Sequence, residues 1–256
     1  MKKRLLVLLI VSLLVLTACG KSEDVKNTDT KNNGEENVQT VPENGDEEKT
    51  EQQDNSEETE NIINTMSSEE KREMNIFLSN FSEAFYNPVS GFYRGDEAKI
   101  DFAYTHITIN SSEKVVAEDY YMGITAEDMD IVLNRFFGES IPHKTPENSK
   151  RWVYKNGKFL VPAASGDSYG NFSIVTEVRV LKDGNYEALF NVYNDPEIVG
   201  GDIITDKTIY SLTDSEASDR YVFVERGKAV LKPKTHNGKQ TYELVHYIVE
   251  NEKAMQ

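Results

Sequence analysis

Cysteine, histidine and positive charge are all scarce in this chain of 256 residues. A single cysteine allows no disulfide within the chain, so the fold must depend on its hydrophobic core. The four histidines show neither H-x-x-x-H nor H-E-x-x-H spacing, and we expect no metal site and no other cofactor. Lysine and arginine number 28 against 44 acids, which gives a net charge of −16. This acidity argues against nucleic acid as a partner.

Only one stretch is strongly hydrophobic, and it lies at the N-terminus. Lys2, Lys3 and Arg4 precede an apolar run over residues 5–16. A run of about a dozen residues is too short to cross a bilayer, which takes roughly 20. Small residues then lead to the single cysteine, Cys19. A basic start, a short apolar run and small residues are typical of an export signal.

The order Leu16, Thr17, Ala18, Cys19 resembles the lipobox of bacterial lipoproteins, which is leucine, two small residues and cysteine. The resemblance implies a signal peptide over residues 1–18 and a diacylglycerol on the sulfur of Cys19. Two acyl chains are enough for stable anchoring. We therefore expect the protein at the extracellular face of the cell membrane. The alternative, an ordinary export signal with a chance cysteine, leaves a lone free thiol.

Residues 19–64 are predicted to form a disordered acidic tether. Residues 21–61 hold about 14 acids against 4 lysines, no aromatic residue and only isolated valines. Such a segment buries too little apolar area to offset its ordering entropy. At about 45 residues its r.m.s. reach is of order 40 Å, which would lift a domain away from the bilayer. The alternative is an acidic tail that binds cations or a basic partner.

The first part of the remaining chain has helical patterns. Ser67 to Glu70 reads as a capping box, and it precedes an apolar stripe that ends before Asn87-Pro88. Residues 100–107 fit either a helix or a strand. Thr125 and Gly138 are predicted to cap a further helix at its two ends. The members of the first stripe are Met74, Phe77, Leu78, Phe81 and Phe85.

From residue 151 onward the pattern is of short strands and tight turns. Hairpins are predicted over residues 152–161 and 172–194, followed by a three-strand meander over residues 221–250 with turns at Arg226-Gly227 and Asn237-Gly238. Connections this short require antiparallel pairing. The prediction is a single α+β domain over residues 65–252, with N-terminal helices packed on a curved antiparallel meander of seven or eight strands.

The order of helices followed by a meander resembles the cystatin-like or nuclear-transport-factor-like arrangement. The same stretch is similar to uncharacterised lipoproteins of Gram-positive bacteria. The first resemblance implies a curved sheet that wraps a helix and leaves a cleft. The second implies a location and no activity, because a fold alone does not supply one.

Two loops carry residues that suggest chemistry. Residues 166–170 match G-x-S-x-G, with Ser168 in the nucleophile position. That chemistry needs a helix after the serine, whereas a strand pattern follows here, so we interpret the segment as a hairpin loop and assign no catalytic residue. Residues 194–206 are rich in oxygen ligands that suit calcium, but their spacing is not that of an EF-hand, and we interpret them as a solvated loop.

Tyr242 and His246 are the residues predicted to line a ligand cleft. On a regularly alternating strand they share a face with Leu244 and Ile248. The alternative for His246 is an ordinary core histidine.

These observations favour a binding or scaffold module without enzymatic activity. Its expected partners are the membrane, through the lipid, and a small ligand, a peptide or another envelope protein. The alternative is an envelope hydrolase acting on peptidoglycan, peptide or ester. That activity would require Ser168 or a carboxylate beside His236 or His246.

Overall fold

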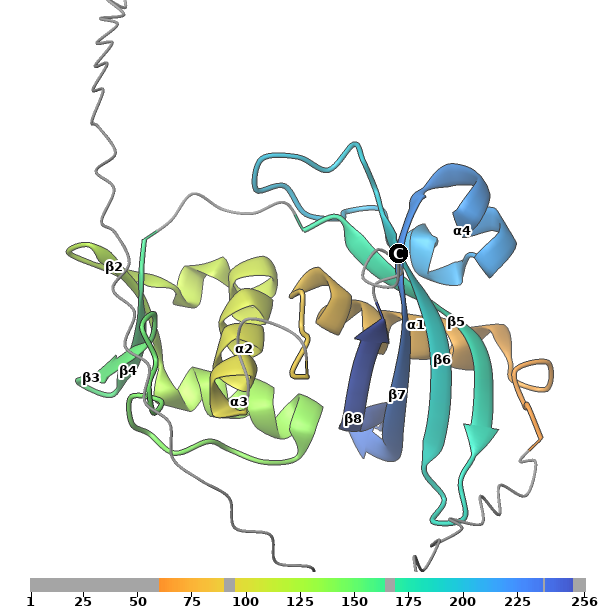
Figure 1. Ribbon diagram of the computed structural model, residues 1–256, viewed down its shortest axis with the longest axis horizontal. Coiled ribbons are helices and arrows are strands. Elements are labelled where there is room, and N and C mark those ends of the chain that lie inside the picture. Colours follow the sequence, from red (N-terminus) through yellow and green to blue (C-terminus); the bar gives the residue numbers. More distant parts are fainter. Residues whose placement is uncertain (1–59, 90–94, 164–168, 237, 251–256) are drawn as a thin grey trace, which may run out of the picture. The chain divides into compact units, whose positions relative to one another are not determined.

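The computed structural model describes residues 60–89, 95–163, 169–236 and 238–250 (Figure 1). The predicted signal peptide, Cys19 and nearly all of the predicted tether lie outside these ranges. Within them, helices and two antiparallel sheets confirm the α+β class. No helix in the described ranges is long and apolar enough to cross a membrane. The helices are α1 (Ser68–Glu83), α2 (Asp96–Asn110), α3 (Ala126–Phe137), α4 (Asp214–Arg220) and the 3-10 helices η1 (Ser112–Lys114) and η2 (Lys207–Ser211).

The strands divide into two four-stranded sheets where the sequence predicted one meander. The first has the order β1-β2-β4-β3 and the second β5-β6-β7-β8. The pairing of β2 with β4 spans α3 and a long loop, so no local pattern indicated it. The strands are β1 (Val116–Glu118), β2 (Tyr121–Thr125), β3 (Val153–Lys155), β4 (Lys158–Pro162), β5 (Asn171–Val180), β6 (Tyr186–Asn194), β7 (Val222–His236) and β8 (Lys239–Glu250).

Helix α1 begins at the predicted capping box and ends earlier than predicted. Ser67 Oγ accepts a hydrogen bond from the backbone N–H of Glu70, and the Glu70 carboxylate accepts one from the backbone N–H of Ser67. The helix ends at Glu83, before the predicted stop at Asn87-Pro88. Phe85 has φ of 51° and is 56% exposed, so its assignment to the apolar stripe was wrong. Tyr86 is buried in its place.

The apolar residues of α2 and the capping residues of α3 explain why these segments are helical. The segment that fitted either a helix or a strand is the helix α2, which buries Ile100, Phe102 and Ile107. Thr125 caps α3 by accepting a hydrogen bond from the backbone N–H of Asp128 at 3.2 Å. Gly138 ends α3 in the left-handed conformation, as predicted.

Phe81 lies at the centre of a core that joins three helices to the second sheet. Helix α1 packs on β5 and β8 at one face of that sheet (Figure 1). The ring of Phe81 is 4.6 Å from that of Phe102 on α2, 5.7 Å from Phe136 on α3 and 5.5 Å from Tyr247 on β8, measured between centroids. A smaller apolar cluster joins β5 and β6 to η2 and α4. These packed aromatic side chains fix how the helices meet.

Strand β7 runs through Arg226-Gly227, where the sequence predicted a turn. Val222–His236 is one strand, and Gly227 pairs with Phe190 on β6. A Cβ atom at Gly227 would lie 2.1 Å from Phe190 Cζ. The glycine therefore leaves room for an aromatic ring and makes no turn.

Two residues before the predicted domain boundary at residue 65, Asn61 and Ile62, are hydrogen-bonded to β5. Asn61 Oδ1 accepts a hydrogen bond from the backbone N–H of Val178 at 3.1 Å. The backbone N–H of Ile62 donates to the carbonyl of Val178 at 2.8 Å. Residues assigned to the tether thus add to the free edge of β5.

Asn75 ties α1 to β5 and η2, and its removal should destabilise the domain. Its side chain is 2% exposed, donates to the carbonyl of Tyr210 at 3.0 Å and accepts from the backbone N–H of Val175 at 2.8 Å. Asn75→Ala leaves both buried backbone groups without these partners, so we expect a loss of about 2 kcal/mol in the free energy of unfolding. Urea unfolding of this variant and of the exposed control Asn134→Ala measures the loss. Equal midpoints for the two variants would contradict this role.

Candidate functional site

Three helices and η2 line an open polar pocket of about 270 Å³, which we call the Glu83 pocket. Four of its residues lie on one face of α1, at spacings of four, four and three residues. Helices α2 and α3 and the 3-10 helix η2 supply the others. The lining residues are Arg72, Ile76, Asn80, Glu83, His106, Asn110, Arg135, Lys207 and Tyr210.

Glu83 is a carboxyl group buried in this pocket. It is 8% exposed, and its Oε1 accepts a hydrogen bond from the hydroxyl of Tyr210 at 2.8 Å. Burial raises the pKa of Glu83 to about 7, although the Tyr210 hydrogen bond and the positive charge of Lys207 oppose the rise. The carboxyl therefore gains and loses its proton near neutral pH.

His106 is a buried neutral donor. Burial, together with the positive charge of the nearby Arg135, lowers its pKa to about 4. The side-chain nitrogen of Asn110 lies 3.2 Å from His106 Nδ1 and 2.9 Å from the His106 carbonyl oxygen. Because an amide nitrogen donates hydrogen bonds, Nδ1 accepts and the ring carries its proton on Nε2. His106 can thus offer an N–H to a ligand without carrying charge.

Three cations lie around the pocket. Arg72 is partly neutralised by Glu73, whose Oε1 is 3.1 Å from its guanidinium. Arg135 and Lys207 have no carboxylate within ion-pair distance in the part of the chain that the structure describes. Both side chains are exposed. They give this pocket a positive rim.

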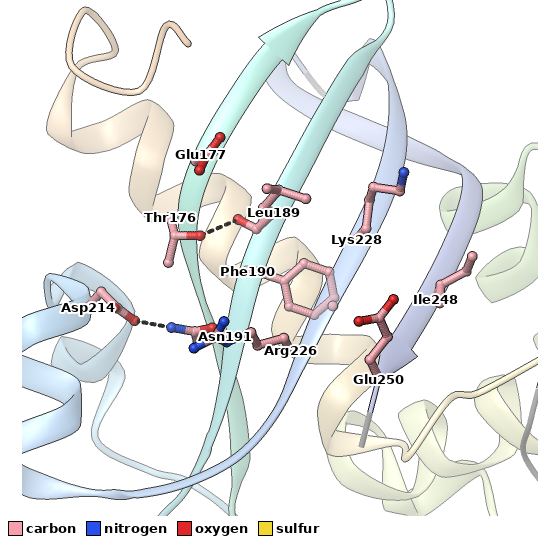
Figure 2. Close-up of a pocket in the computed structure, with 11 residues that line it drawn as sticks. Thr176, Glu177, Leu189, Phe190, Asn191, Asp214, Arg226, Lys228, Ile248 and Glu250 are labelled. Atoms are coloured by element: carbon pink, nitrogen blue, oxygen red, sulfur yellow. Dashed lines mark hydrogen bonds between the residues drawn. The ribbon is translucent and has the colours of Figure 1, made fainter. Parts of the chain in front are cut away.

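A second cavity of about 620 Å³ lies on the face of the second sheet opposite α1 (Figure 2). Figure 2 shows side chains of β6 and β7 standing on this face, with Asp214 at one side and Glu250 at the other. Asp214 accepts a hydrogen bond from Asn191 at 2.8 Å, which holds the start of α4 to the sheet. Lys228 lies 3.4 Å from Glu187, so its charge is partly compensated.

The structure does not bring Tyr242 and His246 together on one face. Tyr242 is 1% exposed and packs in the core, 5.6 Å from the ring of Phe77. The pairing of β7 with β8 shifts between Val230 and Leu231, so the alternation of side chains changes between Leu244 and His246. The predicted shared face was therefore wrong. His246 is exposed and lines a separate cavity of about 270 Å³ with Lys99 and Glu139.

Two loops, residues 166–170 and 194–206, suggested a catalytic serine and a calcium site. Ser168 lies outside the described residues, and the strand β5, not a helix, begins directly after Gly170. Among the residues that the structure describes, no three His, Cys, Asp or Glu side chains are placed to hold a metal ion.

The residues of the Glu83 pocket were missed because they are far apart in sequence. Their one local signal is on α1, where Arg72, Asn80 and Glu83 share a polar face beside the apolar stripe. A buried acid of this kind is often functional. No protein-family model, curated protein or solved structure shows a significant match to this chain.

Proposed function

We propose that this protein is a lipoprotein of the bacterial cell envelope whose extracellular domain is a ligand-binding module. The Glu83 pocket is the observation that supports it. Convergent polar groups around a buried carboxyl with a shifted pKa are a common feature of functional sites. The described residues of its lining include no serine, threonine or cysteine that could act as a nucleophile.

The alternative of a hydrolase has weaker support in this pocket. A carboxyl with a pKa of about 7 suits a general acid. Glycoside hydrolysis ordinarily takes a second carboxyl group, and Glu83 is the one acid among the described residues of the lining. The imidazole of His106 is held by the amide of Asn110, whereas a catalytic base is commonly oriented by a carboxylate. Binding without chemistry fits these residues better.

Binding can be tested with one probe of each charge class. Sulfate, choline and glucose are each added to the full-length chain during thermal unfolding, because a ligand that binds only the folded state raises the midpoint. A binding module with this pocket should be stabilised by at least one class. If none of the three changes the midpoint at millimolar concentration, the pocket is not a small-ligand site.

Cys19 is expected to carry the membrane anchor. In cells given a labelled fatty acid, the wild-type chain should be labelled and should sediment with membranes. The Cys19→Ala variant should be unlabelled and released, because it lacks the sulfur that takes the lipid. If the two chains behave alike and neither is labelled, the protein is not a lipoprotein.

A further inference from the structure

We propose that the Glu83 pocket binds a small soluble oxyanion, through a phosphate, sulfate or carboxylate group, and that Glu83 holds a proton while the anion is bound. The inference rests on the proposed binding function and names the class of its ligand.

The cations at the rim provide the attraction for an anion. Arg135 and Lys207 come from α3 and η2, and neither has a carboxylate partner among the described residues. A guanidinium forms paired hydrogen bonds with carboxylate and phosphate, and a lysine ammonium acts as a point charge. Arg72, on α1, adds a third positive group that shares its charge with Glu73. A cationic ligand would be repelled by all three.

The buried end of the pocket offers hydrogen-bond donors. With Nδ1 accepting from Asn110, His106 lines the pocket as a neutral ring whose proton is on Nε2. Tyr210 already donates to Glu83 Oε1. Glu83 Oε2 has no hydrogen bond within the described ranges, so a proton carried there can be donated to a bound oxygen. An ionised Glu83 would instead repel the anion across a poorly solvated space.

Anion binding and protonation of Glu83 should therefore favour each other. The charged or titratable groups around Glu83 are Arg72 on α1, His106 on α2, Arg135 on α3, and Lys207 and Tyr210 on η2. Among the residues that the structure describes, no second acid lines the pocket and could take the proton. With its pKa near 7, Glu83 is mostly protonated at pH 6 and mostly ionised at pH 8. An anion should bind about tenfold more tightly at pH 6 than at pH 8.

A free solute fits these observations better than a lipid head group. The chain carries a net charge of −16, and residues 21–61 alone account for about −10. An anionic bilayer would repel so acidic a protein. A small cavity of about 270 Å³ also suits a group that enters without acyl chains attached.

Sulfate is the probe, because its charge does not change between pH 6 and pH 8. Isothermal titration of the full-length chain should show about tenfold tighter binding at pH 6. Arg135→Gln should weaken binding about tenfold at both pH values, because one charge-assisted contact is lost. Arg220→Gln, an exposed arginine on α4 outside the pocket lining, is the matched control and should bind as the wild type does.

The Glu83→Gln variant distinguishes the contribution of the Glu83 proton to sulfate binding from that of the surrounding cations. Its amide can donate at every pH, so this variant should bind sulfate at pH 8 as tightly as the wild type does at pH 6. Equal affinity of the Arg135→Gln variant and the wild type for sulfate would overturn the proposal. It would also be overturned if a short-chain phosphatidylglycerol displaced sulfate and glycerol 3-phosphate did not. If choline or glucose binds and sulfate does not, the proposed binding function is supported and the proposal of an oxyanion ligand is wrong. If none of them binds, both proposals fail.

Discussion

Glu83→Gln is expected to stabilise the folded domain at pH 8 and to change its stability little at pH 5. Burial raises the pKa of Glu83 from 4.5 to about 7, so the folded state holds this proton more tightly than the unfolded chain does. Stability is therefore lost as the pH rises from 4.5 to 7. The amide has no proton to lose. The gain in the free energy of unfolding should be about 2 to 3 kcal/mol larger at pH 8 than at pH 5.

Urea unfolding at pH 5 and pH 8 measures this effect. The contribution of His106 to stability changes with pH in the opposite direction. Its pKa falls from 6.5 in the unfolded chain to about 4 in the folded state, so this contribution is lost as the pH falls through that range. Each variant is therefore compared with the wild type at the same pH. Glu147→Gln, at an exposed carboxylate in a loop, is the control for removal of one negative charge. A constant difference between Glu83→Gln and the wild type at both pH values would show that Glu83 has an ordinary pKa.

Gly227→Ala should cost about 3 kcal/mol of stability, although alanine is ordinarily a better strand residue than glycine. The new methyl group would lie 2.1 Å from Cζ and 2.4 Å from Cε2 of Phe190. Phe190 cannot move away freely, because it is 1% exposed and its ring lies 5.4 Å from that of Tyr247. Relief of the clash requires a shift of packed core residues.

A second substitution tests whether the clash with Phe190 is the cause. Phe190→Leu alone should destabilise the domain, because a smaller side chain leaves a cavity. Combined with Gly227→Ala it should cost less than the two single changes added together, since each compensates for the volume of the other. Additive losses in the double variant would contradict the packing role of Gly227.

The parts of the fold that depend on neighbouring residues were predictable. Ser67 and Thr125 cap the helices as expected, because a cap needs partners only three residues away. Asn156 and Gly157 take φ of 52° and 75° and form the predicted hairpin turn. The Arg226-Gly227 turn was wrong, because only Phe190 on another strand explains the glycine. Local chemistry identifies a turn residue, but it cannot show a ring from a distant strand.

The candidate site depends almost entirely on long-range contacts. Glu83 meets Tyr210, which follows it by 127 residues, and no pattern within α1 indicates that partner. The error at His246 has a different origin. The prediction assumed that side chains alternate between the two faces along the whole of β8. A single irregularity in the pairing with β7 places this histidine on the other face. The absence of a suggestive motif in the sequence therefore did not exclude a pocket with titratable groups.

The protonation state of Glu83 tests the central claim most directly. Carbon-13 NMR of the glutamate side-chain carboxyls, with the Glu83→Gln variant to assign the signal, follows this group as the pH changes. The structure predicts a titration near pH 7 that moves upward when sulfate is added, because anion and proton bind together. If the Glu83 signal titrates near 4.5 and does not respond to sulfate, Glu83 is an ordinary carboxylate and the pocket is not the site proposed here.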